Sequence, residues 1–319
     1  MIYTLTLNPA VDYTVFLDGL AQGEINRTKK DSISWGGKGI NVSRILNVFG
    51  LSNTAMGLIA GFTGRALAEG LAAENIRTDF INLTRGRTRI NVKIRAEEET
   101  EINSAGPGIS SGEFDALLAK LRALSKSDTI VLSGGTPPSI TNVMYEDLLG
   151  AISYSGIRFI ADVSGQALQT VVKYKPFLIK PNKKELSAFV NRELTDDITE
   201  IQAAAQEALI KGAQNVLVSL GSKGALLVNR SGSVYSPAPE GEVISSVGAG
   251  DALLAGFISA LYMNNIKTIL LDTEAGRVNA ACALRMAVAA GSAKAFSEPD
   301  KAPSLNDIHR YITSFPKNP

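Results

Sequence analysis

Cysteine and histidine are almost absent from the 319-residue sequence, which has Cys282 and His309 as its single examples. One cysteine excludes a disulfide framework, and the two residues together cannot make a Cys/His zinc site or an H-E-x-x-H helix. A Ser-His-Asp site would have to use His309, whose position near the end of the chain is typical of a plain surface residue. We place Cys282 in the core, on an alanine-rich helix. Catalysis through a thiol or an imidazole is therefore not expected.

Net charge and long apolar runs are also lacking. The 32 lysine and arginine residues nearly balance the 31 aspartate and glutamate residues, which argues against a nucleic-acid partner. The longest apolar stretch, 252–263, has about 12 residues, fewer than the ~20 that cross a bilayer. The first residues lack the basic start and the cleavage site of a signal peptide. We expect a cytoplasmic protein without a membrane partner, which recognises small molecules locally.

The pattern that is present is typical of an α/β protein, in which a mostly parallel sheet is covered by helices. Short β-rich runs bounded by glycine, proline or aspartate alternate with stretches that place apolar residues at helical spacing. The expected strands are 2–7, 53–58, 129–132, 158–161, 177–179, 216–219 and 225–228. The expected helices are 40–49, 64–74, 113–123, 143–152, 185–190, 201–211, 251–263 and 275–290.

Two segments, 11–35 and 88–104, interrupt this alternation. In the second, Arg89, Asn91 and Lys93 alternate with Ile90 and Val92, and this period of two predicts strands with one wet face. Such segments could pair into a small separate sheet, which would serve either as a lid over a site or as a dimerisation surface. The remainder of the chain shows no obvious linker.

The most informative motif is the stretch 246–251, Ser-Val-Gly-Ala-Gly-Asp, which runs directly into an apolar helix. Large side chains do not obstruct the main-chain amides of Gly248, Ala249 and Gly250. Because the positive end of a helix favours an anion, this turn could hold a phosphoryl group. Asp251 could accept the proton of an attacking hydroxyl. The alternative is that Gly250 and Asp251 only cap the helix.

A second glycine cluster, Gly36-Gly37-Lys38-Gly39, also precedes a helix. It is neither a Walker A loop nor a G-x-G-x-x-G dinucleotide fingerprint, because both spacings are missing from the chain. Close backbone approach at the glycines, the cation of Lys38 and the amide of Asn41 suit a polyhydroxyl ligand that carries phosphate. A plain tight turn would use the same glycines.

Two further motifs follow strand ends. In the stretch 180–185, Lys-Pro-Asn-Lys-Lys-Glu, Asn182 and Glu185 lie three residues apart at the start of a helix. Their oxygens suit magnesium held largely through water, although the same pair also makes a capping box. The stretch 219–224, Ser-Leu-Gly-Ser-Lys-Gly, places two glycines after a strand and is equally compatible with an ordinary hairpin.

Taken together and in order, these motifs resemble the phosphofructokinase B branch of the ribokinase-like sugar kinase superfamily. The resemblance spans nearly the whole chain. It is carried by Asn-Pro-Ala-Val-Asp at 8–12, GGKGINVSRIL at 36–46, Asn-x-x-Glu at 182–185, SLGSKG at 219–224 and VGAGDALLAG at 247–256. It implies that residues 1–319 form one three-layer α/β/α domain, with a small discontinuous β-sheet lid formed by about 11–35 and 88–104. It also implies ATP-dependent phosphorylation of a sugar hydroxyl with Mg²⁺ as a cofactor.

The resemblance also implies roles for single residues. Asp251 would be the base, and the amides of Gly248, Ala249 and Gly250 would form the anion hole. Asn182 and Glu185 would organise Mg²⁺, mostly through water. The nucleotide would contact Lys180, Asn182, Ser219, Gly221, Gly224 and Asn279. The sugar would contact Asp12, Gly37, Lys38, Asn41 and Asn91.

Within the branch, the stretch 86–93, Gly-Arg-Thr-Arg-Ile-Asn-Val-Lys, is most similar to enzymes that phosphorylate D-fructose 1-phosphate to fructose 1,6-bisphosphate. Arg89, assisted by Lys38 and Arg27, would bind the phosphate that the substrate already carries, since a dianion needs charge-assisted donors. The alternatives are a tagatose-6-phosphate kinase or a minor-type 6-phosphofructokinase and, from other classes, a non-catalytic sugar-phosphate sensor or a nicotinamide oxidoreductase. A homodimer through the lid is a further expectation.

Overall fold

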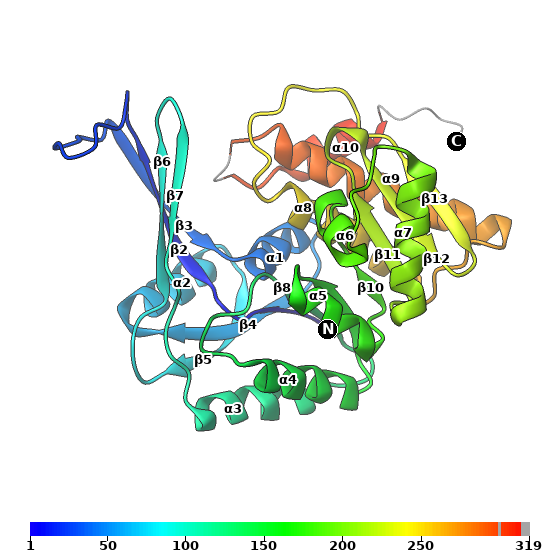
Figure 1. Cartoon of the computed structure of the whole chain (residues 1–319), viewed down its shortest axis with the longest axis horizontal. Helices are drawn as coiled ribbons and strands as arrows, with labels where there is room; N and C mark the ends of the chain where they lie inside the picture. Colours follow the sequence, from blue (N-terminus) through cyan, green and yellow to red (C-terminus); the bar gives the residue numbers. More distant parts are fainter. Residues whose placement is uncertain (299–300, 314–319) are drawn as a thin grey trace.

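The computed structural model, which describes residues 1–298 and 301–313, contains a nine-stranded sheet between two layers of helices and a separate four-stranded sheet (Figure 1). The order of the nine strands is β13-β12-β11-β10-β9-β8-β1-β4-β5. From β11 to β5 neighbouring strands are parallel, whereas β12 and β13 add antiparallel pairs at one edge. The expected α/β class and mostly parallel sheet are confirmed.

The central strands form where the sequence is apolar on both faces. Every residue of β8 (Thr129–Ser133) and β12 (Ala225–Asn229) is buried, as expected for strands covered by helices on both sides. β5 (Arg77–Leu83) and β13 (Gly232–Ser236) expose more residues, and the sequence pattern did not predict them. The other strands of this sheet are β1 (Ile2–Thr6), β4 (Asn53–Ala60), β9 (Arg158–Asp162), β10 (Leu178–Ile179) and β11 (Asn215–Ser219).

Helices cover both faces of the large sheet and enclose two main apolar cores. Fully buried side chains such as Leu5 and Phe257 each stabilise the fold by about 1.5–3 kcal/mol. One face carries α1 (Lys38–Val48), α2 (Gly61–Ala73), α8 (Ala249–Met263), α9 (Glu274–Ala295) and α10 (Leu305–Thr313). The other carries α3 (Ser111–Arg122), α4 (Asn142–Tyr154), α5 (Gln166–Val171), α6 (Lys183–Val190) and α7 (Ile198–Lys211). None of the described helices is long and apolar enough to span a membrane.

The four-stranded sheet projects from the body of the molecule (Figure 1). Its strands come from the two segments that interrupt the helical alternation, in the order β3-β2-β6-β7. They are β2 (Ala10–Phe16), β3 (Lys30–Gly36), β6 (Arg89–Arg95) and β7 (Glu99–Asn103). The register places polar side chains such as Asp12 and Asn91 on one face. The opposite face carries Val11, Tyr13, Val15, Ile33, Val92, Ile94 and Ile102. The small separate sheet expected from the period of two is therefore present.

Cys282 was expected in the core, and this prediction is wrong because the residue is exposed. α9 buries Ala280, Ala283, Leu284 and Ala287, which are spaced as one face of a helix. Cys282 lies on the opposite side of the same helix. Because α9 carries alanine all around its circumference, composition alone does not identify its buried face.

Candidate active site

A cavity of about 880 Å³ opens beside the start of α8 and the ends of β10 and β11. In α/β sheets this carboxyl-terminal edge of the strands is where ligands bind. The cavity brings together most of the residues that the sequence singled out, which are Gly37, Lys38, Asn41, Arg89, Lys180, Asn182, Glu185, Ser219, Gly221, Gly224, Gly248, Ala249, Gly250 and Asp251. Residues that lie more than 200 positions apart in the sequence therefore share one space.

Asp251 lies in the first turn of α8 and is 5% exposed. Its Oδ2 accepts a hydrogen bond of 2.8 Å from Asn41 Nδ2. Burial and the negative charge of Asp162 raise the pKa of Asp251 to about 6, although the Asn41 hydrogen bond and the charges of Lys38 and Lys180 act in the opposite direction. A carboxyl group with its pKa near neutrality can take up and release a proton in the physiological range.

The turn that precedes α8 presents main-chain amides to the cavity. Gly248 has φ = +77°, a conformation that glycine adopts readily. The amide of Ala249 donates to the carbonyl oxygen of Ser246 over 3.3 Å, so this long bond engages one of the three amides within the turn. A Cβ atom on Gly250 would lie 3.3 Å from Lys180 Nζ, which shows how closely the ammonium approaches the helix start. The positive end of α8 and the ammonium group of Lys180 together favour binding of an anion here.

Asp162, at the end of β9, is a site residue that the motifs did not include. Its side chain is fully buried, and its Oδ1 lies 3.2 Å from Lys180 Nζ and 3.4 Å from Lys38 Nζ. Burial by itself would lower the pKa of Lys38, but the charges of Asp162, Asp251 and Glu185 outweigh burial and raise it, so the ammonium keeps its charge. The sequence signal was a carboxylate directly after a buried strand, at the edge where ligands bind.

The glycine cluster before α1 allows a close approach of two chain segments. Gly37 has φ = +131°, and a Cβ atom on Gly39 would lie 2.4 Å from Thr6 Oγ1 at the end of β1. Only glycine fits such a contact. The first turn of α1 is therefore seated directly on β1, and this brings Lys38 and Asn41 to the cavity.

Arg89 reaches the cavity from the four-stranded sheet, at the start of β6. Its Nε donates to the carbonyl oxygen of Asn8 over 3.2 Å, and its Nη1 donates to that of Ser104 over 3.4 Å. Partial burial of the side chain lowers the pKa of Arg89, yet a guanidinium stays charged at neutral pH. Because the group has five N–H donors, these two bonds leave capacity for a bound anion.

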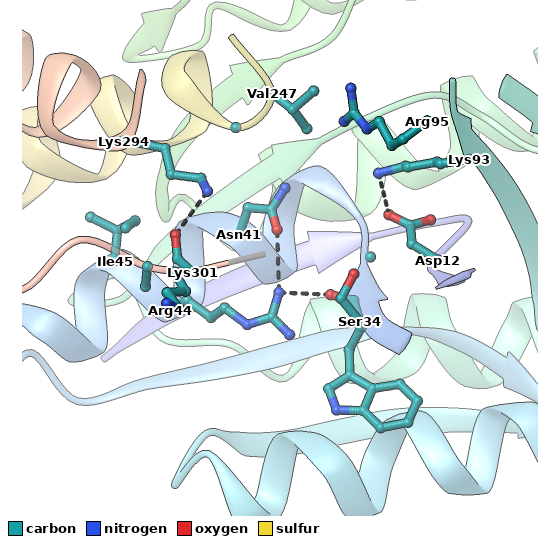
Figure 2. A pocket seen from close by; sticks show the side chains of 14 residues that line it. Asp12, Ser34, Asn41, Arg44, Ile45, Lys93, Arg95, Val247, Lys294 and Lys301 are labelled. Atoms are coloured by element: carbon teal, nitrogen blue, oxygen red, sulfur yellow. Dashed lines mark hydrogen bonds and ion pairs between the residues drawn. The ribbon is translucent and has the colours of Figure 1, made fainter. Parts of the chain in front are cut away.

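Asp12 lines a smaller neighbouring cavity of about 60 Å³. Its carboxylate accepts hydrogen bonds from Asn91 Nδ2 over 2.8 Å and from Lys93 Nζ over 2.9 Å. Figure 2 shows the Lys93–Asp12 pair with Asn41 of α1 opposite. Because Asn41 lines both cavities, Asp12 belongs to the same neighbourhood, with Asn91 as its buried partner.

Asn182 and Glu185 form the capping box that the sequence left open as an alternative. Asn182 Oδ1 accepts from the amide of Glu185 over 2.8 Å, and Glu185 Oε2 accepts from the amide of Asn182 over 2.9 Å. Both side chains nevertheless line the cavity, and the carboxylate uses only Oε2 in the box. Ser219, Gly221 and Gly224 line the adjoining edge, where both glycines have positive φ angles.

One wall of the cavity is apolar and lies outside the motifs. It is formed by Ala238, Pro239 and Val243 from the segment before α8, by Leu253 of α8, and by Val288, Ala295 and Phe296 from α9 and its end. The segment packs tightly there, since a Cβ atom on Gly241 would lie 2.4 Å from the ring of Phe296. Apolar walls of this kind suit a flat aromatic ligand group. Its residues are scattered from 238 to 296, so no local motif revealed them.

Three predicted site residues line neither of these cavities, and of the three only Asn91 has a described hydrogen bond to a residue that does, Asp12. Arg27 is exposed in the segment between β2 and β3 and lines neither of them. Asn279 lines a separate cavity of about 190 Å³ together with Phe257 and Leu261. The roles expected for Arg27 and Asn279 stay predictions without geometric support in this chain.

Comparison with known proteins agrees with this arrangement. Residues 5–304 match the family model described as pfkB family carbohydrate kinase. The chain is 39% identical to the 1-phosphofructokinase of Bacillus subtilis over 298 residues and 37% identical to the D-tagatose-1-phosphate kinase of Bacillus licheniformis over 302 residues, with 93% of each chain covered in both cases. The solved structure of phosphofructokinase-2 from Escherichia coli in complex with potassium is similar with a TM-score of 0.88 and 32% identity, covering 98% of both chains. The chain belongs to the pfkB family of carbohydrate kinases and is an ATP-dependent phosphotransferase.

Proposed function

We propose that this kinase transfers the γ-phosphoryl group of ATP to the free primary hydroxyl of D-fructose 1-phosphate and forms fructose 1,6-bisphosphate. The observation that carries the proposal is the position of Asp251. Its buried carboxylate lies at the start of α8, in the same cavity as two cations that suit a sugar phosphate, Lys38 and Arg89. Loss of turnover in an Asp251 variant is therefore the most direct test.

Asp251 is proposed to act as the base. As the sugar oxygen attacks the γ-phosphorus, its O–H bond breaks and the proton passes to the Asp251 carboxylate, while the bond between the γ-phosphorus and the bridging oxygen breaks and ADP leaves. The Gly248 and Gly250 amides, with Lys180 beside them, would stabilise the negative charge on the transferred group. The Ala249 amide joins them once its long bond to Ser246 opens.

The nucleotide is proposed to lie along the edge lined by Lys180, Ser219, Gly221 and Gly224, with its base against the apolar wall. The positive φ angles of both glycines let the backbone approach phosphate or ribose closely. Both features line the same cavity as Asp251, and in this proposal the terminal phosphate points to the start of α8. A nucleotide placed in this way needs no Walker A loop.

The residues present fit Mg²⁺ held through water. Asn182 and Glu185 supply hard oxygens at the cavity, and the capping box fixes both side chains. Magnesium keeps several waters and takes one or two protein oxygens. When bound, it would neutralise charge on the nucleotide phosphates. The chain's own contribution would be to orient those waters through Glu185 and Asn182.

The sugar is proposed to lie between α1 and the four-stranded sheet. Gly37, Lys38 and Asn41 would contact it from α1, and Arg89 would bind the phosphate that it already carries. Asp12, held by its bond from Asn91, would accept from a sugar hydroxyl. In this proposal the segments 11–35 and 88–104 act as a lid, which excludes water from ATP when the sugar phosphate is bound.

Two alternatives differ in the sugar or in the class of function. By their names, the relatives include kinases of fructose 1-phosphate and of tagatose 1-phosphate. A tagatose-6-phosphate kinase of Staphylococcus epidermidis is also 37% identical to the chain. Lys38 and Arg89 suit the phosphate of each of these sugars. A sugar-phosphate sensor would bind the same ligand without turnover.

The test is a coupled assay of ADP release with six acceptors: fructose 1-phosphate, fructose 6-phosphate, tagatose 1-phosphate, tagatose 6-phosphate, unphosphorylated fructose and water alone. We expect the highest kcat/KM with fructose 1-phosphate and stoichiometric ADP and bisphosphate. A higher value with a tagatose phosphate or with fructose 6-phosphate would replace the proposed substrate. Binding of fructose 1-phosphate without ADP release would favour the sensor.

We also propose that two chains pair through the apolar face of the four-stranded sheet. Ile33 and Ile102 on this face are 60% and 58% exposed, which is unusual for large apolar side chains gathered on one sheet face. Sedimentation velocity should give a dimer for the wild-type chain and a monomer for Ile33→Glu. The matched control is Val143→Glu, which changes an exposed apolar position on α4. A wild-type monomer would contradict this pairing.

A further inference from the structure

Three polar side chains form a buried row at the carboxyl ends of the neighbouring strands β8, β9 and β10. Ser133 of β8 pairs in register with Asp162 of β9, and Lys180 follows β10, the next strand. All three are at most 4% exposed. Within the described part of the chain, Ser133 Oγ and Asp162 Oδ2 have no hydrogen-bond partner. A buried polar oxygen without a partner destabilises a fold, so this row calls for an explanation other than stability.

The two carboxylate oxygens of Asp162 differ in their contacts. Its Oδ1 contacts two ammonium groups, at 3.2 Å and 3.4 Å, whereas its Oδ2 contacts none within the described residues. These two pairs are longer than the Lys93–Asp12 pair, at 2.9 Å. A carboxylate that served only to stabilise the core would gain by using both oxygens. The contacts of Asp162 therefore hold two lysines near one point without binding either of them tightly.

The two lysines near Asp251 come from different elements. Lys38 belongs to the first turn of α1, on the proposed sugar side, and its side chain is 39% exposed. Lys180 is buried, and its Nζ lies close to Gly250 at the start of α8, on the proposed phosphate side. Asp162 lies between the two ammonium groups and is the one residue that contacts both in the described structure.

We propose that Asp162 is a positioning residue, which fixes the ammonium groups of Lys38 and Lys180 near Asp251 so that both meet the phosphoryl group during transfer. This inference rests on the proposed role of Asp251. Because the ion pairs are long, an incoming phosphate can share each lysine with Asp162. The lysines would then stabilise the transferred group in place, and no side chain would have to be ordered during the reaction.

Asp162 also contributes to the charge around Asp251. The groups that act on the Asp251 carboxyl are Asn41 and Lys38 of α1, Asp162 of β9 and Lys180 after β10, while Lys294 of α9 lies beyond Gly248. Of these, the charge of Asp162 opposes ionisation of Asp251. Replacing Asp162 by asparagine therefore has two separate consequences: the lysines lose their anchor, and Asp251 ionises at lower pH.

The experiment compares kcat and both KM values of wild type and Asp162→Asn from pH 5 to pH 9. We expect kcat to fall about 10- to 100-fold. Neither KM should rise, because the cavity gains a net positive charge that favours both anionic substrates. The acid limb of the kcat/KM profile should move to lower pH. The sugar phosphate itself titrates near pH 6, but its contribution is the same for both proteins and cancels in the comparison.

Ser133→Ala is the matched control, since it changes the neighbouring position of the same buried row without changing charge. It should leave the acid limb in place. A rise in both KM values with an unmoved acid limb, or an unchanged kcat, in a folded Asp162→Asn protein would overturn the proposal. If that variant does not fold, Asp162→Glu keeps the charge and displaces it. We then expect a lower kcat with the acid limb unmoved, and an unchanged kcat would overturn the proposal.

Failure of this inference can be told apart from failure of the proposed function. A wild-type enzyme that does not turn over fructose 1-phosphate would contradict the proposed substrate, and the same comparison then uses the carbohydrate that it does phosphorylate. Undiminished turnover in Asp251→Ala would contradict the proposed base. Normal turnover in Asp162→Asn alongside an inactive Asp251→Ala would contradict the positioning role alone.

Discussion

The nine-stranded sheet and the four-stranded sheet differ in how deeply their residues are buried. Every residue of β8 is buried, whereas every residue of β7 is exposed. The large sheet has helices on both faces and carries Asp162 at a strand end. The small sheet has one polar face, which holds Asp12, Asn91 and Arg89. In the proposed function, the body positions the reacting groups, while the small sheet binds the sugar phosphate.

Substitutions in the two sheets should also differ in how much they lower the free energy of unfolding. Leu132 in β8 is 1% exposed, and Ile102 in β7 is 58% exposed. We expect Leu132→Ala to lower the free energy of unfolding by about 2–5 kcal/mol, because it leaves a cavity in a packed core. Ile102→Ala should change it by less than about 1 kcal/mol. Denaturant unfolding of both variants measures the difference, and equal losses would contradict the division between a packed body and an exposed sheet.

Substrate recognition should depend on the small sheet. Arg89→Ala removes the guanidinium that faces the cavity, so we expect the KM for fructose 1-phosphate to rise about 10- to 100-fold while the KM for ATP changes little. Arg85→Ala, an exposed arginine that lines neither cavity described above, is the matched control. Steady-state kinetics with each substrate varied in turn makes the comparison. An equal rise in both KM values would make Arg89 a general structural residue.

The buried carboxylate of Asp251 should destabilise the folded protein at neutral and alkaline pH. The pKa of Asp251 is raised to about 6 from the ordinary value of 3.8, so the folded state holds this proton more tightly than the unfolded state. That contribution to stability is complete below pH 3.8 and is lost as pH rises through 6. Asp251→Asn has no titrating group at this position and therefore does not lose this stability as pH rises. The free energy of unfolding of the variant, relative to wild type, should be greater at pH 8 than at pH 4 by roughly 1–3 kcal/mol. A pH-independent difference in thermal unfolding would contradict the raised pKa.

A smaller effect should appear at the proposed magnesium site in the body. Glu185→Gln keeps the capping box, since glutamine also serves at that position, but it removes the negative charge. We expect the Mg²⁺ concentration for half-maximal activity to rise several-fold with little change in stability. Glu193→Gln, an exposed glutamate nearby in sequence, is the control. An unchanged magnesium titration in Glu185→Gln would argue that the residue only caps α6.

The sequence was most informative where a pattern is local. The short β-rich runs 129–132 and 225–228 predicted strands within one residue of β8 and β12. The period of two in 88–104 predicted β6 and β7, because alternation with one wet face depends only on neighbouring residues. Glycine-rich turns before helices, such as 247–250, likewise need specific backbone angles that leave a mark in the sequence.

Features that depend on distant residues could not be read in this way. Asp162 becomes a site residue only because β9 lies beside β8 and β10, and its partners Lys38 and Lys180 come from elsewhere in the chain. The apolar wall needs both the segment before α8 and Phe296. Cys282 was misplaced because the buried face of α9 is set by its packing against α8, to which its alanine-rich composition gives no clue.

The turnover of Asp251→Ala with fructose 1-phosphate and ATP is the most direct measurement of the proposed chemistry. General-base assistance is worth ~10²–10⁴-fold, so we expect kcat to fall by at least about 100-fold while calorimetry shows fructose 1-phosphate binding within a few-fold of wild type. Turnover close to that of the wild-type enzyme would contradict the assignment of Asp251 as the base.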